Sequence, residues 1–120
     1  MRPQIDQAGF GWIVIAGVRY EYDVVIQLDG RIRRRKKRLS KERYGTSHII
    51  SLEEASDVYE EGCETLLIGS GAFGRVRLSE EAESYFGGRG VTVKAMPTGG
   101  ALESWNLLEG AVVGLFHVTC

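Results

Sequence analysis

The chain has 120 residues, and its hydrophobic content of 43% and charged content of 26% are ordinary for a folded globular domain. This composition excludes global disorder, and the length predicts a single domain over residues 1–120. No run approaches the roughly 18 apolar residues of a membrane-spanning helix, so we expect no membrane contact.

The formal net charge of −1 conceals an asymmetry. Nine of the fifteen Lys and Arg residues lie within residues 31–43, here called the basic segment, where Glu42 is the only acid. The segment therefore carries +8 and the rest of the chain −9. Its cations are Arg31, Arg33, Arg34, Arg35, Lys36, Lys37, Arg38, Lys41 and Arg43. Because opposite charges on one chain can pair between copies, a homo-oligomer is one expectation.

The N-terminus lacks the basic head, apolar stretch and cleavage site of a signal peptide. Two cysteines, Cys63 and Cys120, are too few for a disulfide scaffold of this size. We therefore expect reduced thiols and a cytoplasmic location. Eleven Arg against four Lys, with a single Asn, also favour a heat-adapted source.

The first third of the chain is predicted to be β structure. Phe10–Ile15 and Tyr20–Leu28 are rich in Val, Ile and aromatic residues, and Ala16-Gly17 between them can turn a hairpin. Asp29-Gly30 is a stronger turn signal because Gly accepts a positive φ, and it leads into a short strand at Arg31–Arg35.

Residues 36–50 show no periodicity and are predicted to form a long loop. Ser51 and Glu54 then form a capping box, in which each side chain accepts a hydrogen bond from the other residue's amide. The helix that starts there is predicted to end at Gly62, before a strand at Glu64–Ile68.

Two helices and two strands complete the pattern: a helix from Ser79 to Gly87, a strand at Val91–Met96, a helix from Thr98 to Gly110 and a strand at Ala111–Val118. The last strand is almost uniformly apolar, as expected of a strand covered on both faces. The order is a β-hairpin region followed by α-β-α-β-α-β, which predicts an α/β domain on a mixed sheet.

Five short sequences occur in a characteristic order: Gly9-Phe10-Gly11-Trp12, Asp29-Gly30, Leu67-Ile68-Gly69-Ser70-Gly71, Met96-Pro97-Thr98 and His117-Val118-Thr119-Cys120. Over residues 5–120 the chain resembles a widespread family of small proteins with a domain of unknown function. Its eukaryotic members include a mitochondrial complex I assembly factor and an adipogenesis-associated protein. The resemblance implies a three-layer fold and a protein partner, and it supplies no catalytic residues.

Residues 69–74 match G-x-G-x-x-G directly after a strand. A dinucleotide site requires the helix to begin within the motif, but Arg75–Leu78 intervenes before Ser79. A weaker hypothesis places a small anionic ligand on exposed amides at this edge of the sheet. Its residues would be Gly69, Ser70, Gly71, Gly74, Thr98, Gly99 and His117.

A thiol nucleophile built from Cys120 and His117 conflicts with strand geometry, because residues 117 and 120 would lie on opposite faces of an extended strand. Only His48, from the long loop, could complete such a pair. The two His and two Cys also lack the paired spacing typical of zinc sites, so we expect no metal, no cofactor and no catalytic residues. The acids near the helix starts, Glu53, Glu54, Glu80 and Glu81, are predicted to be solvated.

Three functions remain open. The first is a non-enzymatic protein-interaction or assembly factor, as the resemblance implies. The second is nucleic-acid or other polyanion binding through the basic segment, whose side chains would alternate between two faces if the strand continued to Arg38. The third is an anionic-ligand-binding protein or enzyme that uses the Gly69–Gly74 edge. In the alternative without a polyanion, the basic segment is a solvated strand and loop whose charges are partly neutralised by the acidic remainder of the fold or of a second subunit.

Overall fold

The computed structural model describes residues 2–120. Its centre is a five-stranded mixed sheet in the order β5 (Ile32–Arg34), β4 (Val24–Ile26), β10 (Val112–His117), β7 (Thr65–Ser70) and β9 (Thr92–Met96). Strands β10, β7 and β9 are parallel, whereas β4 and β5 add an antiparallel hairpin at one edge. This arrangement confirms the predicted mixed sheet.

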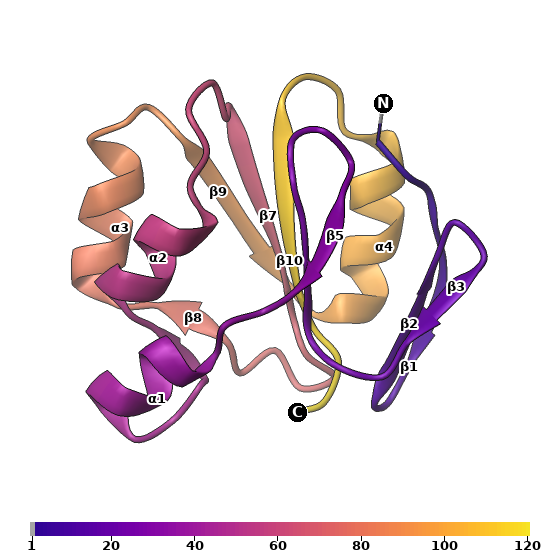
Figure 1. Cartoon of the computed structure of the whole chain (residues 1–120), viewed down its shortest axis with the longest axis horizontal. Helices are drawn as coiled ribbons and strands as arrows, with labels where there is room; N and C mark the ends of the chain where they lie inside the picture. The colour runs from indigo at the N-terminus through magenta and orange to yellow at the C-terminus, as the bar shows by residue number, and fades with distance from the viewer. Residues whose placement is uncertain (1) are drawn as a thin grey trace.

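Two further layers cover the sheet (Figure 1). Helices α2 (Leu52–Val58) and α3 (Glu80–Gly87) lie on one face. The other face carries α4 (Thr98–Leu107) and a three-stranded antiparallel sheet. The strands of that sheet are β1 (Ile5–Gly9), β2 (Trp12–Ile15) and β3 (Val18–Tyr20). The predicted three-layer α/β fold is therefore confirmed, and among the described residues no helix is long and apolar enough to cross a bilayer.

Alternation along the central strands divides the core in two. In β10, Val113 and Leu115 join the cluster beneath α2 and α3, whereas Val112 and Phe116 join the cluster that contains Trp105 of α4. All six residues of β10 are buried, as predicted for a strand covered on both faces. Gly114 lies where the Trp105 and Phe116 rings approach the strand.

The segment predicted as one strand, Tyr20–Leu28, is divided between two sheets. Residues 21–23 carry the chain from β3 in the small sheet to β4 in the central sheet. The side chain of Asp23 turns at this crossing toward the end of β10, where it bonds the Val118 amide. The buried acid Asp23 thus interrupts an otherwise apolar strand pattern.

Helix α1 (Arg38–Tyr44) occupies much of the predicted long loop. Its one buried residue is Ser40, so its sequence shows no apolar periodicity. The only local sequence signal for this helix is Gly45, which caps its C-terminus with a φ of 72°. Helix α2 ends at Val58, and Gly62 lies in the following turn, so the predicted stop at Gly62 is wrong. The two-residue strands β6 (Ile49–Ile50) and β8 (Arg77–Leu78), which pair in parallel, were also not predicted.

The strand directions bring the carboxyl ends of β7, β9 and β10 to one end of the molecule, the lower end in Figure 1. The β7–β8 loop, the start of α4 and residues 118–120 all follow those strand ends. Segments that are distant in sequence therefore meet there.

Replacing Gly114 with Ala should destabilise the fold, whereas replacing Gly99 should not. A Cβ at Gly114 would lie 2.6 Å from the Phe116 ring and 2.8 Å from the Trp105 ring, and such overpacking costs about 1–3 kcal/mol. At Gly99, in the first turn of α4, a Cβ meets nothing within 4 Å, so G99A should add up to about 1 kcal/mol through helix propensity. Urea unfolding of both variants measures this, and equal stabilities would contradict the packing described for β10.

Candidate functional site

The structure pairs most of the basic segment with acids. Ion pairs join Arg31 to Asp29, Arg33 and Lys36 to Asp57, Arg35 to Asp23 and Glu54, Arg38 to Glu42, and Arg43 to Glu81. Within residues 2–120, Arg34, Lys37 and Lys41 have no acidic partner within 4.0 Å. Strand β5 ends at Arg34 and α1 begins at Arg38, so the strand does not continue to Arg38 and the alternation of side chains between two faces does not arise there.

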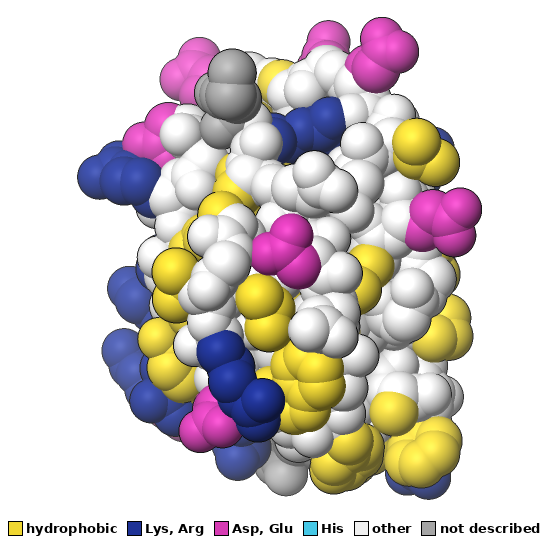
Figure 2. All heavy atoms as spheres, turned by 90° about the vertical axis from the view of Figure 1, so that its right-hand side faces the viewer, with side chains coloured by type: hydrophobic (Ala, Val, Ile, Leu, Met, Phe, Trp, Pro, Cys, Tyr) yellow, Lys and Arg dark blue, Asp and Glu magenta, His cyan; other side chains and the backbone are white. Residues whose placement is uncertain are grey.

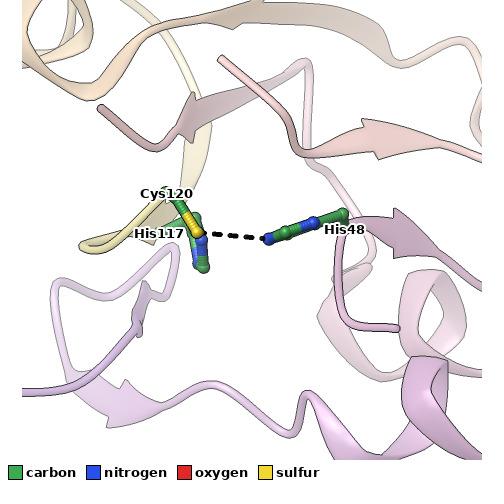
Figure 3. Close-up of side chains that lie close together, drawn as sticks. All are labelled: His48, His117 and Cys120. Atoms are coloured by element: carbon green, nitrogen blue, oxygen red, sulfur yellow. Dashed lines mark hydrogen bonds between the residues drawn. The ribbon is translucent and has the colours of Figure 1, made fainter. Parts of the chain in front are cut away.

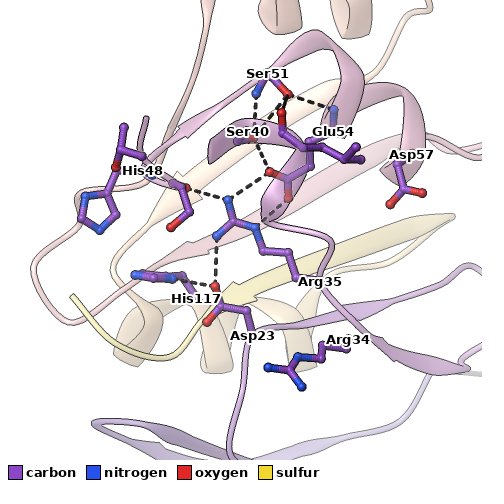
Figure 4. A network of polar contacts seen from close by, with 12 residues as sticks. Asp23, Arg34, Arg35, Ser40, His48, Ser51, Glu54, Asp57 and His117 are labelled. Atoms are coloured by element: carbon purple, nitrogen blue, oxygen red, sulfur yellow. Dashed lines mark hydrogen bonds and ion pairs between the residues drawn. The ribbon is translucent and has the colours of Figure 1, made fainter. Parts of the chain in front are cut away.

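Arg35 lies inside the protein, and its side chain has no exposed surface (Figure 4). Its Nε and Nη2 donate to the Glu54 carboxylate at 2.6 and 3.0 Å, and its Nη1 donates to Asp23 at 3.0 Å. Burial alone would lower the pKa of Arg35, but the hydrogen bonds and charges of Glu54 and Asp23 outweigh it and raise that pKa. Arg35 therefore remains a cation that no external polyanion can reach, which corrects its place among the predicted polyanion contacts.

Glu54 is fully buried, so the prediction that it is solvated is wrong. The capping box also forms only in half: Ser51 Oγ accepts from the Glu54 amide at 3.1 Å. The Glu54 carboxylate instead accepts from Arg35 and from the hydroxyl of Ser40, and the Ser51 amide donates to Ser40 Oγ at 3.0 Å. Ser40 of α1 therefore replaces the Glu54 carboxylate as the acceptor of the Ser51 amide.

Asp23 links this network to the end of β10. Its Oδ2 lies 2.7 Å from His117 Nδ1, and its Oδ1 accepts from the Val118 amide at 2.9 Å. Burial opposes ionisation of Asp23, but the hydrogen bonds from His117 and Val118 and the charges of His117 and Arg35 outweigh it and hold its pKa at about 2. An ionised carboxylate only accepts, so His117 Nδ1 carries the hydrogen and, in the neutral ring, Nε2 presents its lone pair. Thr119 Oγ1 lies 3.3 Å from that Nε2.

His48, His117 and Cys120 converge (Figure 3). Cys120 Sγ lies 3.9 Å from His48 Nε2, and one donor atom from each of the three side chains lies within 4.8 Å of the others. The strand-face argument against this meeting was wrong, because β10 ends at His117 and residues 118–120 are not extended strand. Desolvation and the charges of His117, Arg75 and Arg35 lower the pKa of His48, which favours its neutral ring.

The glycine-rich edge is assembled as predicted, but its amides are occupied. The Gly71 amide donates to Thr98 Oγ1 at 2.9 Å, Thr98 Oγ1 donates to the His117 carbonyl at 2.7 Å, and the Ala72 amide donates to the Thr119 carbonyl at 2.8 Å. A Cβ at Gly69 would lie 2.7 Å from the Phe116 ring. The glycines therefore allow close packing at Gly69 and a positive φ at Gly71, and these two amides are not free for an anion.

The remaining residues of the predicted anion site lie around this core. Ser70 is buried at the end of β7, whereas Gly74 and Gly99 are exposed. The loop runs from Ser70 into β8 and not into a helix, so the backbone lacks the helix start that a dinucleotide fingerprint requires.

Comparison with known proteins identifies the family. Residues 5–117 match the family model described as protein of unknown function (DUF498/DUF598). The chain belongs to this family. The match bears out the resemblance to proteins with a domain of unknown function.

Solved structures agree with this assignment. A conserved hypothetical protein, PH1505, of Pyrococcus horikoshii OT3 is 34% identical, with 98% of this chain and 99% of that chain covered and a TM-score of 0.89. A protein titled MT938 is 30% identical over 98% and 99% of the two chains, with a TM-score of 0.82. A Mth938-like domain of a Bordetella pertussis protein shares the fold at 19% identity and a TM-score of 0.66, over 97% of this chain and 85% of that chain.

Replacing Asp23 with Asn should destabilise the protein in a pH-dependent way. The pKa of Asp23 is lowered from 3.8 to about 2 in the fold, so its ionisation stabilises the fold fully above pH 3.8, and this contribution disappears as the pH falls toward 2. The contribution is about 2 kcal/mol, and loss of one partner of a buried ion pair brings the total cost near neutral pH to about 3 kcal/mol.

Urea unfolding from pH 7 to pH 2.5 measures the difference between D23N and the native sequence. That difference should shrink below pH 4. The control E42Q removes a carboxylate from the exposed Arg38–Glu42 pair and should change stability by less than about 0.5 kcal/mol. A D23N difference that stays constant over the whole range would contradict the lowered pKa.

Proposed function

We propose that this chain is a cytoplasmic, non-enzymatic protein-interaction or assembly factor that holds an apolar side chain of its partner in a surface groove. Its family is described as one of unknown function, and the resemblance to a family that includes an assembly factor implies a protein partner. The observation that carries the proposal is an apolar groove, lined in part by the exposed Phe10, at the end of the molecule where β7 and β10 finish.

The groove lies between the β1–β2 turn, the start of α4 and the residue that follows β10. Its lining carries no charged side chain: Ala8, Gly9, Phe10, Ala72, Thr98, Gly99 and Val118. Its volume of about 280 Å³ is below the range of about 300–1,000 Å³ typical of small-molecule sites. A single large apolar side chain suits such a space better than a cofactor does.

Two exposed phenylalanines belong to this region: Phe10 is part of the lining, and Phe73 directly follows Ala72 of the lining in the sequence. Their exposed fractions are 64% and 68%. Figure 2 faces the side of the molecule that is on the right in Figure 1, and it shows hydrophobic side chains gathered over the lower part of that side. Exposed aromatic residues next to a pocket are the usual anchors of protein interfaces, and an isolated domain gains nothing from exposing them.

Arg75 indicates that the partner carries a negative charge next to its apolar side chain. Its guanidinium lies 6.0 Å from the centroid of the Phe73 ring, and the side chain is exposed. No ion pair joins it to an acid of residues 2–120 within 4.0 Å. A partner segment with an apolar anchor next to a carboxylate would satisfy both the groove and this charge.

A second candidate is polyanion binding by the basic segment. It rests on Arg34, Lys37 and Lys41, the three cations of the basic segment that have no ion pair within residues 2–120, and on a hollow of about 390 Å³ lined by residues 34–38. Three phosphate contacts would give a slope of log affinity against log salt of about −2.7 on duplex DNA. This is a weaker dependence than nine free cations would produce.

The test is affinity purification from the native host with matched variants. The double variant F10A/F73A should lose a protein that the native chain retains, because truncating each anchor of an interface commonly costs more than 1 kcal/mol of binding. The control L107A truncates an even more exposed side chain, at 74%, at the opposite end of α4, and it should retain the protein.

Nuclease treatment and a charge variant separate the two candidates. The partner should survive nuclease and should still bind R34E/K37E/K41E. Co-purified nucleic acid that is lost in this charge variant, and kept by F10A/F73A, would favour polyanion binding. Equal retention by F10A/F73A and L107A would contradict the groove proposal.

A further inference from the structure

We propose that His48, His117 and Cys120 bind one divalent transition-metal ion of the zinc class. The inference is independent of the groove and of any protein partner. Two imidazole nitrogens and a thiolate sulfur form a borderline-soft donor set, which suits zinc and not magnesium or calcium.

The spacing of the donor atoms fits a tetrahedral ion after small movements. Zinc lies about 2.3 Å from sulfur and about 2.0–2.1 Å from nitrogen, so a tetrahedral site places sulfur and nitrogen roughly 3.6 Å apart. Cys120 Sγ and His48 Nε2 lie 3.9 Å apart, and one donor atom from each of the three side chains lies within 4.8 Å of the others. His48 and Cys120 are half-buried, so they are the two ligands that would rotate to close the set around buried His117.

The strongest support is the orientation of His117. A metal-binding histidine usually donates its second ring N–H to a carboxylate, which fixes the tautomer and makes the other nitrogen a better donor. His117 Nδ1 lies 2.7 Å from Asp23 Oδ2, and Arg35 holds that carboxylate in place at 3.0 Å. Because Nδ1 faces Asp23, Nε2 is the ring nitrogen of His117 that is left for a metal ion, and its contact with Thr119 Oγ1 is long, at 3.3 Å.

The site is open on one side. His48 and Cys120 are half-buried, whereas His117 is almost completely buried. Three protein ligands leave a fourth tetrahedral position for water or for a side chain of another molecule. Binding converts the Cys120 thiol to a thiolate and releases its proton to the buffer.

The test is titration of the full chain, reduced and freed of metal, with Zn²⁺ by calorimetry and with Co²⁺ by absorption. We expect one equivalent of Zn²⁺, proton release that appears as a buffer-dependent enthalpy, and a cobalt–thiolate charge-transfer band. Zn²⁺ should also protect Cys120 from alkylation by iodoacetamide. C120S should lose the band, whereas C63A, which removes the other thiol, should keep it.

Two variants test the other ligands. H48A removes a half-buried ligand and should weaken Zn²⁺ binding at least tenfold, and D23N should weaken it by about 10–100-fold while leaving all three ligands present. Absence of Zn²⁺ binding by the native chain would overturn the proposal. So would binding that C120S and H48A leave unchanged, or a cobalt spectrum without a thiolate band, and neither result depends on whether D23N folds.

Discussion

The buried guanidinium of Arg35 is the charge around which the lower half of the fold is arranged. A cation without exposed surface is tolerated only where acceptors surround it, and Arg35 finds them in Asp23 before β4, the Ser47 carbonyl before β6 and Glu54 in α2. These acceptors come from three separate segments, so a single side chain joins the edge of the central sheet to the helical layer. Glu54 extends the connection to α1 through Ser40.

Networks of this kind seldom add net stability over an apolar core, and we infer that this one favours a single arrangement of the chain. Here the arrangement that matters is the end of β10. Asp23 accepts a hydrogen bond from the Val118 amide and lies against His117 Nδ1. The carboxylate that pairs with Arg35 therefore also positions the end of β10 and the residue that follows it. Val118 lines the apolar groove and His117 belongs to the donor cluster. Both proposed sites therefore depend on Asp23.

Most helices and strands of the central α/β unit could be predicted because they depend on apolar periodicity and local stop signals, whereas the three-layer arrangement was implied by the family resemblance. The β10 strand, the α2, α3 and α4 helices and the Asp29-Gly30 turn all carry local signals. Helix α1 and the state of Arg35 and Glu54 could not be predicted, because their burial depends on partners distant in sequence. An arginine within a run of basic residues and a glutamate in a capping box are both usually exposed to solvent, so the sequence predicts exposed side chains for Arg35 and Glu54. The signals that existed were an acid directly before apolar β4 and the His-x-x-Cys spacing of His117 and Cys120.

Ionised Asp23 accepts a hydrogen bond from His117 and so fixes the orientation of that ring. The side-chain nitrogen NMR spectrum of His117 tests this in the metal-free protein near neutral pH, at a pH where the ring is neutral. We expect the tautomer with the hydrogen on Nδ1 and an unprotonated Nε2. A spectrum that places the hydrogen on Nε2 would contradict this orientation, because Asp23 would then lose the hydrogen bond from His117 and the donor cluster would lose its nitrogen lone pair.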